Sequence, residues 1–243
     1  MKITSPVNDN IKLYKSLTAL SKARRETGLF TLEGLRLISD ADIQFHTVFY
    51  TPENADKING IKADRLFEIT EEIAEKISDT KSPQGLFAIA EIPHGKVTCG
   101  GKILVLHSLR DPGNLGTIIR AADAFGISGI LAIDCADIYS PKTVRAAMGA
   151  LFRANIEKCD EETAFEKLGG YDTFAAVLSD GAETLGEFVF PEKSAIFIGN
   201  EANGLPDETI EKCKRRVTIK MRGNAESLNA ASAASILLYE FLK

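Results

Sequence analysis

The sequence of 243 residues predicts an α/β protein with a small N-terminal α/β domain and a larger C-terminal domain built on a mainly parallel sheet. Beyond residue 101, apolar runs alternate with helical patterns, which is typical of parallel strands joined by crossover helices and covered on both faces. Residues 93–101 have the Pro and Gly content of a linker. The domains are therefore predicted at residues 1–95 and 101–243, although the length alone suits either one large domain or two modest ones.

The N-terminal domain is predicted from short elements of both kinds. In residues 9–27, Ile11, Leu13, Leu17 and Leu20 have near-helical spacing, with Asp9 or Asn10 available as N-cap and Gly28 as a stop. The elements expected next are a turn at 32–34, a helix at 34–41, a strand at 46–50, a helix at 70–77 and a strand at 86–92.

The C-terminal domain is predicted from longer apolar runs. Strands are expected at 103–106, 127–133, 174–178, 195–198 and 216–219, and helices at 115–125, 141–148 and 227–242. Ser140 is suited to cap the middle helix, with Pro141 at its first position.

Composition limits the class of protein. The net charge of −5 gives no global positive field, so a nucleic-acid partner would have to be held by local basic patches. Cys99, Cys135, Cys159 and Cys213 lie far apart, which argues against a zinc ribbon or a redox motif and favours reduced thiols without a metal. The first residues do not resemble a signal peptide, and no apolar run approaches the roughly 20 residues that cross a bilayer. We expect a soluble, cytoplasmic protein without a membrane partner.

Three loops rich in Gly, Asn and small polar residues follow predicted strands, at 109–120, 198–206 and 219–229. In open α/β sheets, ligands bind beyond the carboxyl ends of the strands. Neither G-x-G-x-x-G nor G-x-x-x-x-G-K-[ST] is present, which disfavours a dinucleotide dehydrogenase or a P-loop NTPase. Taken singly, each loop also fits an ordinary strand-to-helix turn whose polar residues act as caps.

Together the loops resemble the three signature motifs of the SpoU (TrmH-like) branch of the SPOUT methyltransferases. The residues that carry the resemblance are Asn114-Leu115-Gly116 with Arg120, Gly199-Asn200-Glu201 with Gly204-Leu205, and Ile219, Met221 and Gly223 with Ser227-Leu228-Asn229. The resemblance covers residues 101–243 and extends more weakly over residues 10–92, which are similar to the substrate-binding domain of ribosomal-RNA members. Lys220 stands where the family usually has Pro.

The resemblance implies an RNA ribose 2′-O-methyltransferase that uses S-adenosylmethionine, with a deep C-terminal trefoil knot and a homodimer that completes each active site. It places Arg120 at the target hydroxyl and the adjacent phosphate. An arginine is effectively always protonated, so we expect it to hold the phosphate and stabilise a developing alkoxide rather than act as a base. Without the resemblance, Arg120 would be an ordinary helix arginine in an ion pair.

The resemblance implies roles for the other motif residues as well. Asn114 would orient Arg120 or the RNA, or only cap a helix. Glu201 would anchor an arginine or a ribose hydroxyl, or be a solvated acid. Ser227 and Asn229 would contact the arginine or the nucleotide, although a capping role for Ser227 is nearly as good an interpretation. The positions expected to bind the cofactor are Gly199, Ile219, Met221 and Leu228.

The RNA partner would meet local basic patches. Residues 1–36 hold seven basic side chains against three acidic ones, and residues 211–222 hold six against one. The candidate RNA-binding residues are Lys12, Lys22, Arg24, Arg25, Arg110, Lys142 and Arg145. His107, beside the first motif, is expected to pack or hydrogen-bond rather than shuttle protons. Ribosomal RNA is favoured over tRNA because the N-terminal domain is present; a non-catalytic RNA-binding or ribosome-assembly protein is the other alternative.

Overall fold

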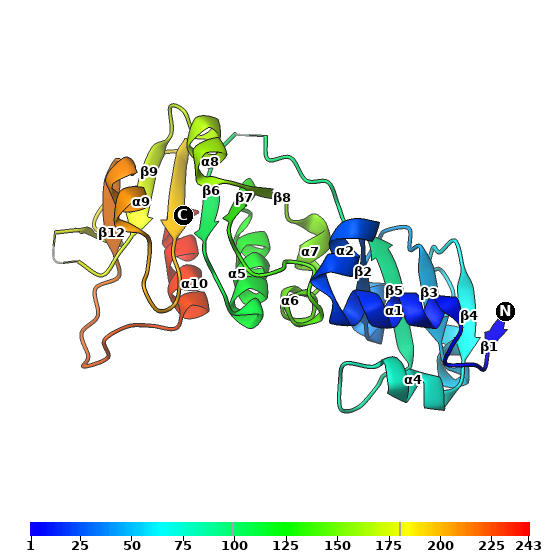
Figure 1. Ribbon diagram of the computed structural model, residues 1–243. Coiled ribbons are helices and arrows are strands. Elements are labelled where there is room, and N and C mark those ends of the chain that lie inside the picture. Colours follow the sequence, from blue (N-terminus) through cyan, green and yellow to red (C-terminus); the bar gives the residue numbers. More distant parts are fainter. Residues whose placement is uncertain (99, 180) are drawn as a thin grey trace. The chain divides into compact units, whose positions relative to one another are not determined.

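The computed structural model describes residues 1–98, 100–179 and 181–243, so Cys99 lies outside the described residues. The chain divides into two compact units (Figure 1). Unit 1 comprises Met1–Pro93 and Tyr139–Phe152, and unit 2 comprises His94–Ile138 and Arg153–Lys243. The segment 139–152, expected within the C-terminal domain, thus clusters with the N-terminal residues.

Unit 1 is built on a five-stranded mixed sheet of order β1-β4-β3-β5-β2, in which β5 runs antiparallel to both neighbours. Its strands are β1 (Lys2–Ile3), β2 (Leu29–Glu33), β3 (Thr47–Tyr50), β4 (Leu66–Ile69) and β5 (Leu86–Glu91). Its helices are α1 (Asp9–Ala19), α2 (Ser21–Thr27), α3 (Leu35–Ser39), the 3₁₀ helix η1 (Pro52–Ile58), α4 (Glu71–Ile77), α6 (Pro141–Ala147) and the first residues of α7 (Ala150–Arg153). Side chains of α1 and α4 share a buried cluster with those of β3, β4 and β5.

The helix expected over residues 9–27 is two helices. The chain breaks at Leu20, which is extended (φ −121°, ψ 116°) and 56% exposed rather than on an apolar stripe. The break is stabilised by Arg24, whose guanidinium donates to the last carbonyls of α1, at Leu17 and Thr18. Asn8, not Asp9 or Asn10, is the N-cap, whereas Gly28 ends α2 in the left-handed region (φ +67°) as predicted.

The turn expected at 32–34 is wrong in its first two residues. Leu32 and Glu33 belong to β2, where they pair with Ala88 and Phe87 of β5. These two residues are part of a strand because they pair with β5, and the local sequence does not reveal that pairing.

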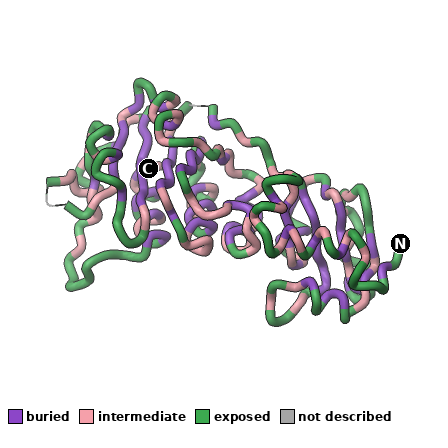
Figure 2. Tube along the Cα trace, in the orientation of Figure 1, coloured by how far each residue is buried: buried purple, intermediate pink, exposed green. Residues whose placement is uncertain are grey.

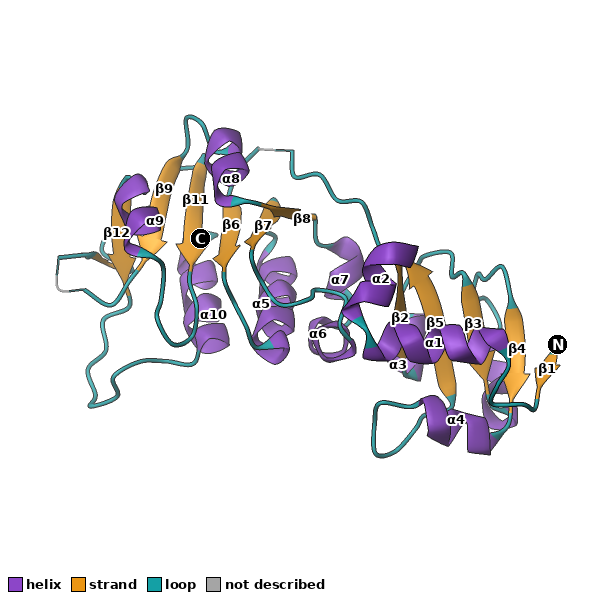
Figure 3. Cartoon of the chain, viewed as in Figure 1, coloured by secondary structure: helices purple, strands orange, loops and turns teal. Residues whose placement is uncertain are grey.

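Unit 2 is built on a seven-stranded sheet of order β10-β12-β9-β11-β6-β7-β8, and all its strand pairs are parallel (Figure 3). The strands are β6 (Ile103–His107), β7 (Gly129–Ile133), β8 (Ile156–Cys159), β9 (Asp172–Ala176), β10 (Glu183–Thr184), β11 (Ser194–Ile198) and β12 (Arg215–Thr218). The helices are α5 (Pro112–Phe125), α8 (Glu161–Lys167), α9 (Asp207–Lys212) and α10 (Ala230–Phe241). The α/β class and the parallel second sheet are confirmed.

Both faces of this sheet are covered. Residues of α8 and α9 share a buried cluster with Val105, Leu131 and Phe197, and α5 packs against α10 behind the sheet (Figure 3). The strands β6, β7 and β11 are buried at every residue (Figure 2). Their nearly continuous apolar sequences follow from burial on two sides.

Two helices begin at residues other than those expected. Asp111 caps α5 by accepting from the Asn114 N–H, with Pro112 at the first helical position, so Asn114 lies inside the helix. Asn229 caps α10 by accepting from the Ala231 N–H, so Ser227 has no capping role. The cap at Ser140 is as predicted.

Within the described residues, no helix combines the length and the apolar character of a membrane span. In the same residues, no three His, Cys, Asp or Glu side chains gather in a way that could hold a metal ion.

Candidate functional site

A cavity of about 750 Å³ lies at the carboxyl edge of the sheet of unit 2, where the loops after β9, β11 and β12 meet. This volume is in the range of small-molecule sites. All four residues expected to bind a cofactor line it, together with two of the expected catalytic residues: Gly199, Ile219, Met221 and Leu228, and Glu201 and Ser227. Two of the three loops therefore form its wall.

The second loop is folded tightly against itself. The N–H groups of Asn200 and Gly204 each donate to the other residue's carbonyl at 2.9 Å. A Cβ at Gly199 would lie 2.2 Å from the carbonyl carbon of Gly204, and Gly204 itself has φ +69°. Glycine is required at both positions. At residue 199 a side chain would collide with the Gly204 backbone, and at residue 204 only glycine adopts the left-handed conformation without strain.

Hydrogen bonds join residues of all three loops. The Asn114 Nδ2 donates to Glu201 Oε1 at 3.2 Å, and the Asn229 Nδ2 donates to Asn114 Oδ1 at 3.1 Å. The Oδ1 of Asn114 is available to Asn229 because Asp111, and not Asn114, caps the helix. Three of the five expected catalytic residues, far apart in sequence, are thus brought together.

Glu201 is held as an anion by this network. Its carboxylate also accepts from the backbone N–H groups of Arg110 and Asp111, at 3.4 Å each. Desolvation alone would raise the pKa of Glu201, but hydrogen bonds from its own N–H, from Asn114 and from these two N–H groups outweigh it and lower the pKa. Among the described residues no guanidinium binds Glu201, so its partners are an amide and the backbone rather than an arginine.

Arg120 stands apart from the network. It lies on an exposed part of α5, does not line the cavity, and forms no hydrogen bond or ion pair with any described residue. Neighbouring residues on its face of the helix, Thr117 and Ala124, are exposed as well. Within the described residues of one chain, Arg120 is therefore not bonded to the other expected catalytic residues.

Asn200 belongs to the second motif, but the sequence assigned it no role at the site. Its Nδ2 donates to the Ser108 carbonyl at 2.8 Å, and its Oδ1 accepts from the Ala202 N–H at 2.8 Å. Ser108 has a positive φ of 56°, and it directly precedes the first loop. Asn200 therefore joins the first loop to the second; its place in a Gly-Asn-Glu turn was the available signal.

The expected RNA-binding residues differ in availability. Arg24 is 4% exposed and is engaged with the end of α1, so it is removed from the set. Lys12 and Lys22 are exposed and form single ion pairs with Asp9 and Glu26. Arg25 is exposed without a partner among the described residues.

The remaining three lie elsewhere. Arg110 pairs with Asp134 in unit 2. Lys142 and Arg145 belong to α6 in unit 1, where Arg145 binds Asp79 at 2.8 Å.

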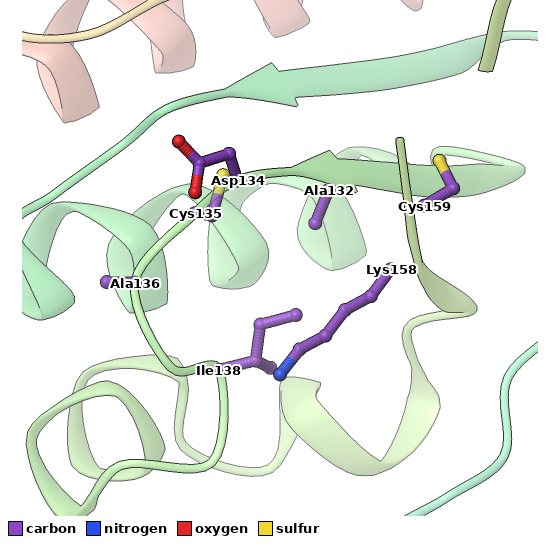
Figure 4. Close-up of a pocket in the computed structure, with 7 residues that line it drawn as sticks. All are labelled: Ala132, Asp134, Cys135, Ala136, Ile138, Lys158 and Cys159. Carbon is purple, nitrogen blue, oxygen red and sulfur yellow. The ribbon is translucent and has the colours of Figure 1, made fainter. Parts of the chain in front are cut away.

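A smaller cavity of about 270 Å³ lies between the ends of β7 and β8 (Figure 4) and shares no residue with the first. Its lining residues are Ala132, Asp134, Cys135, Ala136, Ile138, Lys158 and Cys159. Burial raises the pKa of Cys135 and of Cys159 to about 11, so both thiols are neutral. Both are free, as is Cys213.

A parallel sheet with a ligand-sized cavity at its carboxyl edge defines unit 2 as an α/β ligand-binding enzyme domain. Residues 101–239 match the model of the SpoU rRNA Methylase family, and residues 8–88 match that of the MRM3-like substrate binding domain. The chain belongs to the SpoU rRNA methylase family, which confirms the predicted resemblance.

Relatives with known names extend over the whole chain. It is 31% identical to the 23S rRNA (guanosine(2553)-2′-O)-methyltransferase RlmP of Bacillus subtilis (strain 168), with 98% of each chain covered. It is 28% identical to the 23S rRNA (uridine(2479)-2′-O)-methyltransferase of Streptomyces viridochromogenes, covering 100% of this chain and 92% of the relative. The crystal structure of an AdoMet-bound rRNA methyltransferase from Sinorhizobium meliloti is similar with a TM-score of 0.88 and 32% identity, over 99% of this chain and 97% of that one.

Proposed function

We propose that the protein transfers a methyl group from S-adenosylmethionine to a ribose 2′-hydroxyl of ribosomal RNA. The observation that carries this proposal is that the second and third signature loops line one cavity and that the Asn114–Glu201–Asn229 hydrogen bonds join the first loop to both of them. The names of the relatives, two of which methylate 23S rRNA, support the same reaction and substrate.

The lining of the cavity fits the methyl donor. Of its described lining residues, four are acidic and one, Arg216, is basic; the acids are Glu201, Asp207, Glu211 and Glu226. An acidic cavity suits a ligand that carries a sulfonium and an ammonium group. Ile219, Met221 and Leu228 add apolar surface for a purine ring.

Different residues of the chain would bind the donor, position the loops and bind the RNA. When bound, the donor supplies an electrophilic methyl group on sulfur. The backbone at Gly199, Ile219 and Leu228 would hold the donor, and Asn114, Glu201 and Asn229 fix the loops relative to one another. Transfer needs the ribose oxygen in line with the methyl carbon and the sulfur, so fixed loops favour the reaction through positioning. Arg120 would bind the RNA phosphate and stabilise the developing alkoxide.

We propose that two copies associate through the exposed face of α5 and α10. This face carries Phe125, Ile236 and Tyr239, which are 39%, 41% and 57% exposed, and the Phe125 and Tyr239 rings lie 6.0 Å apart. Exposed large apolar side chains that gather on one face are typical of an interaction surface. Arg120 lies on the same helix, so association would carry it toward the cavity of the second copy.

Three further assignments belong to the proposal. The C-terminal segment would be threaded as the deep trefoil knot that the family resemblance implies, and residues 1–95 would bind the substrate RNA. The basic residues that would contact the RNA are Lys12, Lys22, Arg25, Arg110, Lys142 and Arg145. The free thiols of Cys135, Cys159 and Cys213 support a reducing compartment such as the cytoplasm.

The proposal is tested by calorimetry with S-adenosylmethionine and by transfer of its labelled methyl group to total RNA. Arg120→Ala is expected to abolish transfer and to retain donor binding, because Arg120 lies outside the cavity. Thr117→Ala, one turn earlier on the same exposed face, is the matched control and should keep both. Wild-type protein that binds no donor, or Arg120→Ala protein that transfers normally, would contradict the proposal.

Association in which each copy completes the other is tested by mixing two inactive variants. Ser227→Trp fills the cavity from an exposed loop, whereas Arg120→Ala leaves the cavity intact. After subunit exchange, half of the dimers are mixed and each has one complete site, so the mixture should recover about a quarter of the wild-type rate. An inactive mixture would place Arg120 at the cavity of its own chain.

A further inference from the structure

Behind the first loop lies a polar cluster that the reaction described above does not use. The Glu161 carboxylate is its centre. Its Oε2 accepts from His107 Nε2 at 3.2 Å and from the Thr209 hydroxyl at 2.6 Å, and its Oε1 accepts from Lys212 Nζ at 2.5 Å. The cluster therefore joins three elements: the end of β6, the start of α8, and α9.

Two members of the cluster are buried, whereas Glu161 is partly exposed and the Lys212 side chain is 53% exposed. Thr209 is fully buried and His107 is 8% exposed. The Nδ1 of His107 is buried without a hydrogen-bond partner among the described residues, so Glu161 is the only polar group that holds this ring there. Desolvation opposes ionisation of Glu161, but hydrogen bonds from Lys212 and Thr209 prevail and lower its pKa. The centre of the cluster is thus an anion bound by three donors.

The cluster lies between the first loop and the donor cavity. His107 is directly followed by Ser108, the strained residue that precedes the first loop and whose carbonyl accepts from Asn200. Strained backbone of this kind persists only where its surroundings fix it. On the other side, Thr209 and Lys212 belong to α9, and Ile210 of the same helix lines the large cavity.

We propose that Glu161 is a positioning residue for methyl transfer. Its carboxylate holds the end of β6 and helix α9 in one arrangement, and this arrangement fixes the first loop, with Asn114, relative to the donor cavity. Glu161 does not line the cavity, so it acts through His107 and α9 rather than on the donor itself. The inference rests on the proposed function, since it concerns the same site.

The test compares Glu161→Gln with Glu162→Gln in the methyl-transfer assay. Glutamine keeps the shape of Glu161 but loses the charge that binds Lys212. Glu162 is the matched control, because it is the next residue of α8, is exposed, and has no hydrogen bond or ion pair with a described residue; it acts on Lys212 through its charge alone. We expect kcat to fall about tenfold or more in Glu161→Gln, since small misplacements of reacting groups are costly. The dissociation constant of S-adenosylhomocysteine should change much less, and Glu162→Gln should match the wild type in both.

A second pair of variants keeps the test informative if Glu161→Gln folds poorly. His107→Gln retains an N–H group that can donate to Glu161, whereas His107→Leu does not. We expect His107→Gln to restore most of the kcat that His107→Leu loses, both measured well below the melting temperature of each variant. Variants that melt earlier but keep the wild-type kcat would show a purely structural cluster and overturn the inference. Wild-type protein that binds no S-adenosylhomocysteine would instead refute the proposed function.

Discussion

The Asn114–Glu201 hydrogen bond can be tested by replacing the side-chain amide of Asn114 with a carboxyl group. In Asn114→Asp, a second carboxyl group replaces the amide that now donates to Glu201 at 3.2 Å. At low pH the neutral aspartic acid can donate as asparagine does. Once it ionises, two carboxylates face each other, and the protein is destabilised.

The magnitude follows from the distance and the exposure. Two like charges about 4 Å apart repel by about 1 kcal/mol in water and about 4 kcal/mol at an effective dielectric constant of 20. The contact is solvent-exposed, so screening favours the lower figure, about 1–2 kcal/mol. Repulsion raises the pKa of the new acid above its unfolded value. The folded state then binds the proton more tightly, so stability relative to wild type is retained at low pH and lost as pH rises through that pKa.

The measurement is the melting temperature of wild type, Asn114→Asp and Asn114→Ala between pH 4 and pH 8. The alanine variant lacks both hydrogen bonds at every pH, so the aspartate variant should fall below it by roughly 2–6 °C as the pH approaches 7. High salt should shrink the difference. Asn224→Asp, in the exposed third loop, controls for added charge. Parallel profiles for the aspartate and alanine variants would show that residue 114 does not face Glu201.

Three other predictions follow from local geometry. Gly199→Ala should weaken donor binding more than about tenfold in calorimetry, because its Cβ would meet Gly204 at 2.2 Å; wild-type affinity would contradict the tight turn. Cys135 and Cys159, with pKa values of about 11, should react with iodoacetamide at pH 7.5 about a hundredfold more slowly than a free thiol, and rapid labelling seen by mass spectrometry would disprove their burial. Arg24→Met should lower the free energy of unfolding by about 1–3 kcal/mol in denaturant titrations, by leaving carbonyls of α1 without a donor, and should leave RNA affinity unchanged; weaker RNA binding by the folded variant would return Arg24 to the RNA-binding set.

The central strands could be predicted because each is a run of consecutive apolar residues. The strands β6, β7 and β11 are apolar at nearly every position, since both of their faces are covered. The edge strand β8, with sequence Ile-Glu-Lys-Cys, and the two-residue β10 have no such pattern. They are strands only because β7 and β12 offer them a partner, which the sequence does not reveal locally.

The helix starts at the site show a different limit. Asp and Asn are about equally good caps, so composition alone could not rank Asp111 against Asn114. Pro112 was the signal that could have decided, because proline favours the first helical position and Asp111 directly precedes it. The consequence is chemical as well as structural: a capping Asn114 would engage its Oδ1 with the helix N–H groups, and in this structure that oxygen accepts from Asn229 instead.

The burial of Arg24 could also have been predicted from the sequence. Arg24 lies seven residues after Leu17, on the line of the apolar stripe of the predicted helix. Counting charge over residues 1–36 hides this, because a sum treats a buried guanidinium and a solvated one alike. The break between α1 and α2 turns Arg24 back toward the end of α1, and its hydrogen bonds to the carbonyls there stabilise the break.

The site itself depends on contacts that no local pattern encodes. Asn114 meets Glu201 and Asn229 because β6 and β11 are neighbours in the sheet and α5 packs on α10, although 87 and 115 residues separate the partners. The same contacts explain why Glu201 binds no arginine among the residues that the structure describes: its oxygens already accept from Asn114 and from the backbone of the first loop. Arg120, left exposed on α5, is then the one expected catalytic group that has neither a bond to the network nor a place in the cavity wall. On the proposed function, donor binding and methyl transfer are expected to be separable, because Arg120 lies outside the residues that line the cavity.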